Sequence, residues 1–171
     1  MKTIFLDIDG CLNCATTTKR LDVSYEFLFV DTRKVLRLRD IVERTGAQLV
    51  LSSTWRFGAD PKAFYLEKLA YCKLLEEFRR VRCPIWTDIT PYLPRAKRWQ
   101  EINAWLLLHP EVEDYIIIDD WGEDEFRPMM DRLVKCNARF GLTKERAELA
   151  IQMLGEVDNG AKISRNSSKD E

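Results

Sequence analysis

The feature that most constrains this chain is an apolar run near its N-terminus that ends in two carboxylates, IFLDIDG at residues 4–10. Apolar, β-branched and aromatic residues in a run of this length predict a buried strand. Asp7 and Asp9 are two residues apart, so both side chains would face the space beyond the strand. Because unpaired carboxylates are costly to bury, the pattern indicates either a bound cation, for which Mg²⁺ suits oxygen ligands, or a turn capped by an aspartate.

Two further apolar runs, 49–51 and 115–118, predict strands that also end in polar side chains. The polar residues that follow these runs are Ser52, Ser53, Asp119 and Asp120. Three basic residues lie between the two runs, at the start of a predicted amphipathic helix: Arg95, Lys97 and Arg98. Strands that alternate with helices predict a parallel sheet with right-handed crossovers. Ligands bind beyond the carboxyl ends of such strands, so we expect the polar residues to meet there.

Turn residues and apolar periodicity predict the other elements. They are a β-hairpin at 23–30, a helix capped by Asp31 and Gly46, a strand at 47–52, a helix at 62–80, a short strand at 83–88, a helix at 95–108, a strand at 114–119, an acidic loop at 121–125, a helical turn at 126–131, a strand at 133–136 and a final helix capped by Thr143.

Composition narrows the classes of function. The 27 basic and 28 acidic residues give a net charge of −1, so no global field attracts nucleic acid or an anionic membrane. No apolar run approaches the ~20 residues that span a bilayer, and the pair Cys11-x-x-Cys14 lacks the further ligands of a zinc site. We expect a cytoplasmic protein with one domain over 1–155 and a disordered tail over 156–171. The oligomeric state stays open, and a monomer is compatible with the sequence.

The order of the segments, strand-DxD, strand-Ser, Lys/Arg and strand-DD, resembles the four motifs of the haloacid dehalogenase (HAD) phosphatase superfamily. Finer features resemble the HAD domain of the Swiss Army Knife RNA repair proteins. They are Ser-Ser-Thr-Trp-Arg at 52–56, Thr90-Pro91, Glu101-Ile102 with Trp105-Leu106, and Gly141-Leu142-Thr143. The resemblance covers about residues 2–155. It implies a Rossmannoid α/β fold: a parallel sheet of about five strands with helices on both faces, a β-flap and no large cap domain.

The resemblance also implies catalytic roles for three residues at the strand ends. Asp7 would attack phosphorus to give an aspartyl-phosphate. Asp9 would protonate the leaving group and then activate water. Ser52 would bind a phosphoryl oxygen while Ser53 points elsewhere, and the reverse assignment is the alternative.

The cation that would offset the phosphoryl charge is left open between Lys97 and Arg98. The register of the motif favours Arg98, whereas the superfamily more often uses a lysine. The chain departs from the family here, because Trp99 stands where the family usually has glycine.

The metal implied by the resemblance is Mg²⁺. The expected metal-site residues are Asp7, Asp9 through its backbone carbonyl, Asp119, Asp120 and Asp124. Asp124 lies four residues beyond Asp120, which matches the family's spacing for a second acid. Glu125 is its rival, and a solvated acidic loop is the simpler alternative.

The expected substrate contacts are Gly10, Ser53, Trp55, Arg56 and Trp121. Trp55 and Trp121 would offer aromatic faces on which a base can stack. Trp55 would equally well fill a gap beside the sheet.

These features together predict an Mg²⁺-dependent phosphomonoesterase. The intervals between the motifs leave no room for a cap domain, so an open site could admit a phosphorylated RNA or DNA end, with a 3′-phosphate as the preferred substrate. The alternatives are a phosphatase for nucleotides or other small molecules and, from a different class, a catalytically silent HAD module that only binds. A DxD motif argues against dehalogenation, because the second acid supplies a proton that dehalogenation does not need.

Overall fold

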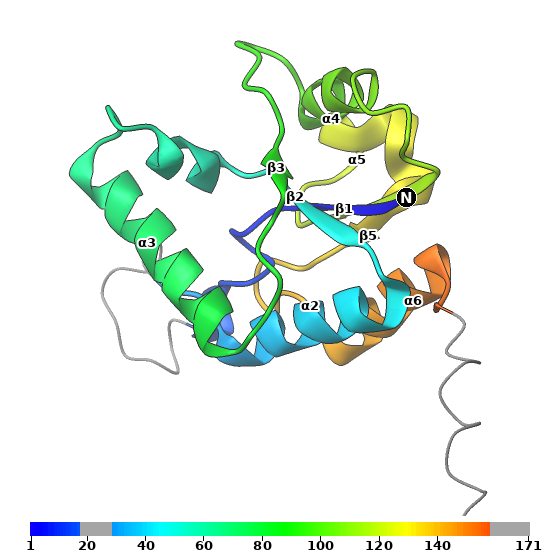
Figure 1. Cartoon of the computed structure of the whole chain (residues 1–171), viewed down its shortest axis with the longest axis horizontal. Coiled ribbons are helices and arrows are strands. Elements are labelled where there is room, and N and C mark those ends of the chain that lie inside the picture. The colour runs from blue at the N-terminus through cyan, green and yellow to red at the C-terminus, as the bar shows by residue number, and fades with distance from the viewer. Residues whose placement is uncertain (18–28, 158–171) are drawn as a thin grey trace, which may run out of the picture.

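The computed structural model describes residues 1–17 and 29–157, which form a parallel five-stranded sheet covered by helices (Figure 1). The strands are β1 (Lys2–Leu6), β2 (Gln48–Leu51), β3 (Asp88–Ile89), β4 (Asp114–Asp119) and β5 (Leu133–Lys135). Their order in the sheet is β3-β2-β1-β4-β5. The α/β fold, the parallel sheet and its strand number are therefore confirmed.

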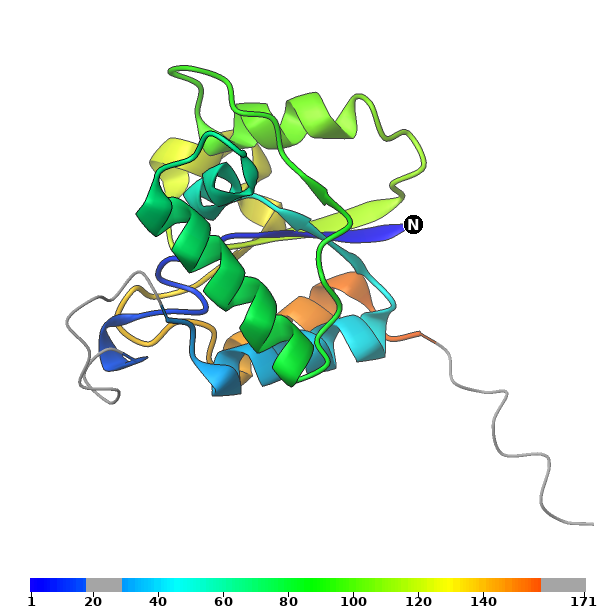
Figure 2. The same ribbon diagram turned by 60° about the vertical axis from the view of Figure 1, so that its left-hand side comes forward.

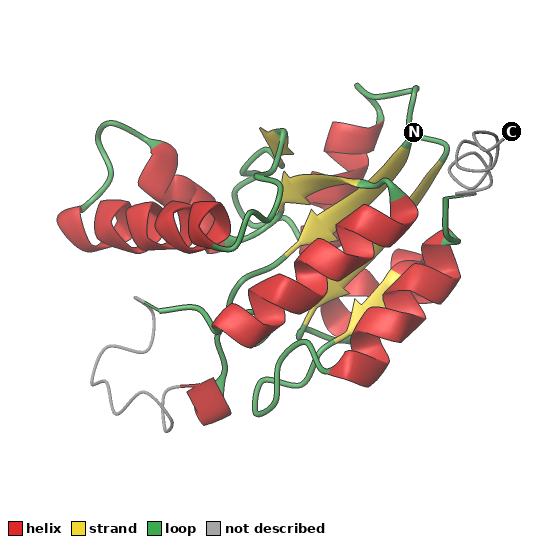
Figure 3. Ribbon diagram, turned by 60° about the horizontal axis from the view of Figure 1, so that its bottom comes forward, coloured by secondary structure: helices red, strands yellow, loops and turns green. Residues whose placement is uncertain are grey.

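Helices cover both faces of the sheet (Figure 2). The helices are α2 (Thr32–Thr45), α3 (Tyr65–Arg80), α4 (Arg98–Leu106), α5 (Glu123–Phe126) and α6 (Lys144–Leu154), together with the 3-10 helices η2 (Thr54–Ala59) and η3 (Arg127–Arg132). One apolar core joins the sheet to α2, α3 and α6, and a second joins the other face to α4 and the α5–η3 segment. In Figure 3, α2 and α6 lie side by side across the first face.

The central position of β1 follows from its sequence. Residues Ile4, Phe5 and Leu6 are fully buried, which suits a strand that is covered on both faces. Ile4 and Leu6 belong to the first core, and Phe5 belongs to the second, as alternation along a strand requires. Leu6 is aligned with Leu51 of β2 on one side and Ile118 of β4 on the other. The residues that follow these three strands therefore lie at the same level.

The capping residues of two helices were predicted correctly. The Asp31 carboxylate accepts a hydrogen bond from the Arg33 backbone N–H at 2.9 Å, and Gly46 ends α2 in the left-handed conformation, with φ of 67°. Thr143 caps α6 through a hydrogen bond from the Arg146 backbone N–H to its side chain.

Three predicted elements are corrected by the structure. The strand expected at 83–88 is reduced to Asp88–Ile89, because Pro84 offers no N–H and Trp86 packs against Phe78 in the core. The helices expected at 62–80 and 95–108 are shorter at their N-termini and begin at Tyr65 and Arg98. The loop expected at 121–125 contains the start of α5.

Two predicted segments lie mostly outside the described residues. They are the hairpin expected at 23–30 and the tail expected at 156–171. Between β2 and α4 the chain forms η2, α3 and β3, and α3 packs its buried face into the first core. No helix within the described residues is long and apolar enough to cross a membrane.

Candidate active site

Polar residues meet at the carboxyl ends of β1, β2 and β4, and the strand order of the sheet reverses between β1 and β4. The Asp7 backbone N–H donates to the Ile118 carbonyl at 2.9 Å, and the Ser52 N–H donates to the Leu6 carbonyl at 2.8 Å. The ladders thus continue one residue past β1 and β2 and bring Asp7 and Ser52 level with Asp119. This is the place at which open α/β sheets bind ligands.

Strand alternation explains why two of the acids share a face. Asp7 follows Phe5 at a spacing of two, and Asp119 follows Ile117 in the same way; Phe5 and Ile117 both lie in the core beneath α4. The two carboxylates therefore face the N-terminal end of α4, which begins at Arg98. Asp7 is 6% exposed and Asp119 is 1% exposed.

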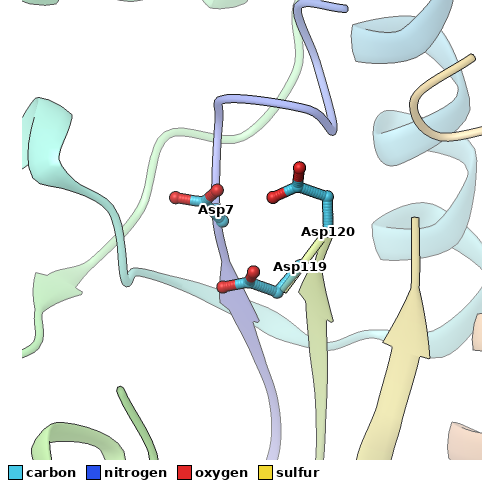
Figure 4. A group of neighbouring side chains, drawn as sticks. All are labelled: Asp7, Asp119 and Asp120. Atoms are coloured by element: carbon cyan, nitrogen blue, oxygen red, sulfur yellow. The ribbon is translucent and has the colours of Figure 1, made fainter. Parts of the chain in front are cut away.

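Asp7, Asp119 and Asp120 form a compact acidic group. One carboxylate oxygen of each residue lies within 4.8 Å of the others, and Figure 4 shows the three side chains converging beyond the ends of β1 and β4. Burial, reinforced by the charge of Asp119, raises the pKa of Asp7 well above its ordinary value. Burial likewise raises the pKa of Asp119 to about 6 and raises that of half-buried Asp120.

The donor set of this group fits a magnesium ion. It offers hard carboxylate oxygens on a partly open edge, and Mg²⁺ prefers one or two carboxylates with water and substrate oxygens completing its shell. A dication would also offset the mutual repulsion of the acids. The residues that would hold it are Asp7, Asp119 and Asp120.

Gly10 is required by the approach of Asp120 to the turn after β1. Its φ of 69° is in the left-handed region, and a Cβ at this position would lie 2.2 Å from Oδ2 of Asp120. The Gly10 N–H donates to the Asn13 side chain at 3.2 Å. The substrate contact expected of Gly10 stays a prediction, whereas the structure shows that its small size makes room for Asp120, a predicted metal ligand.

Asp9 lies outside the acidic group and is held by two hydrogen bonds. Asn13 Nδ2 donates to Oδ1 of Asp9 at 2.7 Å, and Trp55 Nε1 donates to Oδ2 at 3.0 Å. Asn13 was missed in the sequence, although a polar side chain in a turn after Asp-x-Asp-Gly is a usable signal. Trp55 is 7% exposed, so the structure gives it a gap-filling place with a polar contact to Asp9.

The two serines after β2 have different hydrogen-bond partners. The Ser53 hydroxyl hydrogen-bonds the Asp7 carboxylate, which works to lower the pKa of that group. The Ser52 hydroxyl lies 3.5 Å from the hydroxyl of Thr90. The geometry therefore brings Ser53, rather than Ser52, to Asp7, and which of the two hydroxyls binds a phosphoryl oxygen stays a prediction.

Arg98 and Lys97 point to different partners. Arg98 is 6% exposed, donates to the Ser52 carbonyl, and its charge works against the raised pKa values of Asp7 and Asp119. Lys97 is exposed, and its ammonium group donates to the Asp124 backbone carbonyl. Of these two residues, Arg98 is the one placed to offset charge at Asp7.

The structure does not bring Asp124 into the acidic group. Its side chain is exposed on α5, and its carbonyl is used by Lys97. The rival residue, Glu125, accepts a hydrogen bond from the Arg98 backbone N–H at 2.9 Å. Glu125 therefore caps α4, a favourable place for a carboxylate because the helix N-terminus carries partial positive charge.

Arg56 lies in the interior, which corrects its prediction as a substrate contact. Its guanidinium group forms two hydrogen bonds to the Glu101 carboxylate, at 2.8 and 2.9 Å, and one to the Thr90 hydroxyl at 2.7 Å. Arg56 and Glu101 are 6% and 5% exposed. Burial of a charge demands such partners, so this pair links η2 to α4 rather than reaching a ligand.

Trp121 is bound to the acidic group through its backbone, and its ring is exposed. Its backbone N–H donates to Oδ1 of Asp119 at 2.8 Å, and its ring centroid lies 5.4 Å from the Arg98 guanidinium carbon. The side chain is 48% exposed. The ring is therefore open to solvent close to the acidic group.

Comparison with known proteins gives one match. Residues 3–147 match the sequence model of a family described as the HAD domain in Swiss Army Knife RNA repair proteins. Neither the curated proteins nor the solved structures include a significant match.

The acidic group predicts a stability response to metal that can be measured without any substrate. Mg²⁺ at a hundred times its dissociation constant should stabilise the wild type by about 2.7 kcal/mol, or roughly 5–10 °C in melting temperature. Asp119→Asn should melt no lower than the wild type in EDTA, because it removes a buried charge from the group, and should lose most of the Mg²⁺ response. Differential scanning fluorimetry measures both.

Asp124→Asn is the matched control, since it removes an acid from the neighbouring segment and should keep the full Mg²⁺ response. An undiminished response in Asp119→Asn would contradict the assignment of the metal site.

Proposed function

This chain belongs to the family of HAD domains in Swiss Army Knife RNA repair proteins, and on that premise we propose that it is an Mg²⁺-dependent phosphatase that acts through an aspartyl-phosphate. The observation that carries the proposal is the division between two acids of one motif. Asp7 is buried against Ser53 and near Arg98. Asp9 lies outside the acidic group and accepts hydrogen bonds from Asn13 and Trp55. These are different environments, as a nucleophile and a general acid require.

In the first step Asp7 acts as the nucleophile. One of its carboxylate oxygens forms a bond to phosphorus while the ester P–O bond breaks, and the leaving alkoxide takes a proton from Asp9. Arg98 offsets part of the negative charge on the phosphoryl group. A bound Mg²⁺ would supply further positive charge to the phosphoryl oxygens.

In the second step Asp9 acts as the base. It removes a proton from the water that attacks the aspartyl-phosphate, so that inorganic phosphate leaves and the Asp7 carboxylate is regenerated. Asn13 and Trp55 hold one oxygen of Asp9 each. The carboxylate therefore stays in one orientation through both proton transfers, which supports a role for these two residues in positioning it.

The substrate that we propose is a phosphorylated nucleic-acid end, with a 3′-phosphate preferred. The RNA repair proteins of the family support this class, as does the exposed ring of Trp121 beside Arg98. The net charge of −1 favours the second candidate, a small-molecule phosphatase, because a polyanion gains little from such a surface.

The role of Asp9 predicts a dependence on the leaving group. Asp9→Asn should lower kcat for alkyl phosphates by about 10²–10⁴-fold, because an alkoxide leaves poorly without a proton. With p-nitrophenyl phosphate the first step should survive, because nitrophenolate is a stable leaving group. Stopped-flow absorbance should then record a burst of about one nitrophenolate per enzyme before slow turnover. Equal impairment of burst and turnover with both esters would show that Asp9 has another role.

The substrate class predicts a ranking of rates. At fixed ionic strength and with Mg²⁺, kcat/KM should be higher for a 3′-phosphorylated oligonucleotide than for a nucleoside 3′-monophosphate or a sugar phosphate. A tenfold difference corresponds to about 1.4 kcal/mol of transition-state preference. Phosphate release measures all three substrates under the same conditions. If the small molecules are preferred tenfold or more, the small-molecule function replaces the nucleic-acid one.

A further inference from the structure

A pocket beside Asp9 has no part in the chemistry described above. It has a volume of about 250 Å³ and lies between η2 and the N-terminal end of α3, two elements that pack against each other (Figure 1). Its lining is formed by Asp9, Thr54, Trp55, Phe57, Leu66, Glu67 and Ala70. Four of these seven side chains are apolar, and the Glu67 carboxylate accepts a hydrogen bond from the Phe64 backbone N–H.

The position of Asp9 determines which part of a substrate would enter this pocket. A general acid must lie within hydrogen-bond distance of the leaving oxygen, and Asp9 forms part of the pocket wall. The group attached to that oxygen therefore lies next to the pocket, whereas the phosphoryl group lies toward Asp7. A leaving group in this orientation would extend into the pocket.

The apolar part of the lining suits a flat ring system better than a polyol. Phe57 lies partly exposed, and Leu66 is 49% exposed, so both can contact a ligand. Trp55, by contrast, is buried and held to Asp9. The volume is below the roughly 300–1,000 Å³ of drug-sized ligand sites, so one ring system fills it.

The apolar surface continues outside the pocket along the start of α3. Phe64, Tyr65 and Leu66 are three consecutive large apolar residues, and Phe64 and Tyr65 are 81% and 76% exposed. Runs of this kind on a surface mark binding sites in soluble proteins. The Phe57 ring also meets the ring of exposed Tyr92 edge-on, at a centroid distance of 5.2 Å.

Residues 64–66 are here called the α3 platform. We propose that the pocket and the α3 platform bind the terminal bases of a single-stranded nucleic acid whose phosphorylated end is the substrate. This inference rests on the proposed function and adds the subsite that recognises the leaving group. Aromatic and apolar surfaces stack bases without regard to sequence. Stacking also needs no net positive charge, which agrees with the net charge of −1 and predicts a small dependence of affinity on salt.

The test measures binding in EDTA, where the metal-dependent reaction does not run. The probe is a short single-stranded oligonucleotide with a 3′-phosphate and a fluorescent label at its 5′ end, followed by anisotropy. A variant that combines Phe64→Ser, Tyr65→Ser and Leu66→Ser should bind at least about fivefold more weakly than the wild type. Leu107→Ser is the matched control, because Leu107 is 76% exposed but follows α4 at the end opposite Arg98; it should bind as the wild type does.

A second ligand tests the same claim on the wild-type protein alone. An abasic oligonucleotide of equal length and charge should bind at least about fivefold more weakly than the natural one. The inference is overturned if the triple variant, with an unchanged circular dichroism spectrum, binds normally, or if the abasic ligand binds equally well. It is also overturned if a phosphotyrosine peptide binds more tightly than the oligonucleotide and depends on the same residues.

A different experiment tests the proposed function. If no ester releases phosphate in the presence of Mg²⁺, the proposed function is wrong, whatever the binding results in EDTA. Conversely, turnover without dependence on the α3 platform would leave the phosphatase in place and remove only the subsite.

Discussion

The repulsion among Asp7, Asp119 and Asp120 is the constraint on which the rest of the site depends. One carboxylate oxygen of each lies within 4.8 Å of the others at a largely buried strand edge. Such a group stays ionised only if positive charge lies beside it. Arg98 supplies part of that charge from the N-terminal end of α4. A divalent cation would supply the remainder. We therefore expect the same positive charges to stabilise the three acids and to bind the phosphoryl group of a substrate.

Arg98 can serve the acids only because α4 is held in place by other contacts. Glu125 caps the helix at the Arg98 N–H, and the buried Arg56–Glu101 pair ties α4 to η2. Removal of one partner from such a pair typically costs about 3–5 kcal/mol. η2 in turn carries Trp55, whose indole N–H holds Asp9. The same short segment therefore positions both the cation and the second acid of the motif.

Much of this arrangement could be predicted from the sequence, because it follows from strand ends. The periodicity around Asp7 and Asp119 identified two buried strands, and parallel strands place their carboxyl ends together. The acidic group joins the residues that this reasoning selected. The caps of α2 were equally predictable, since Asp31 and Gly46 act through local backbone geometry.

The remaining features depend on tertiary orientation, which residue spacing does not encode. Arg56 was expected to contact substrate because it directly follows the serine motif, but η2 turns it toward Glu101. Asp124 matched a family spacing, yet α5 directs its side chain to solvent. The strand expected at 83–88 failed because the apolar residues there pack against α3 instead of extending β3.

The central claim is that Asp7 becomes phosphorylated, and the most direct measurement identifies the modified residue. The wild type would be mixed with p-nitrophenyl phosphate and Mg²⁺, quenched in acid within milliseconds and reduced with borohydride, which converts an aspartyl-phosphate to homoserine. Peptide mass spectrometry should then find homoserine at position 7 and nowhere else, with none formed in EDTA. Modification of Asp9 or another residue, or sustained turnover with Asp7 unmodified, would contradict the account.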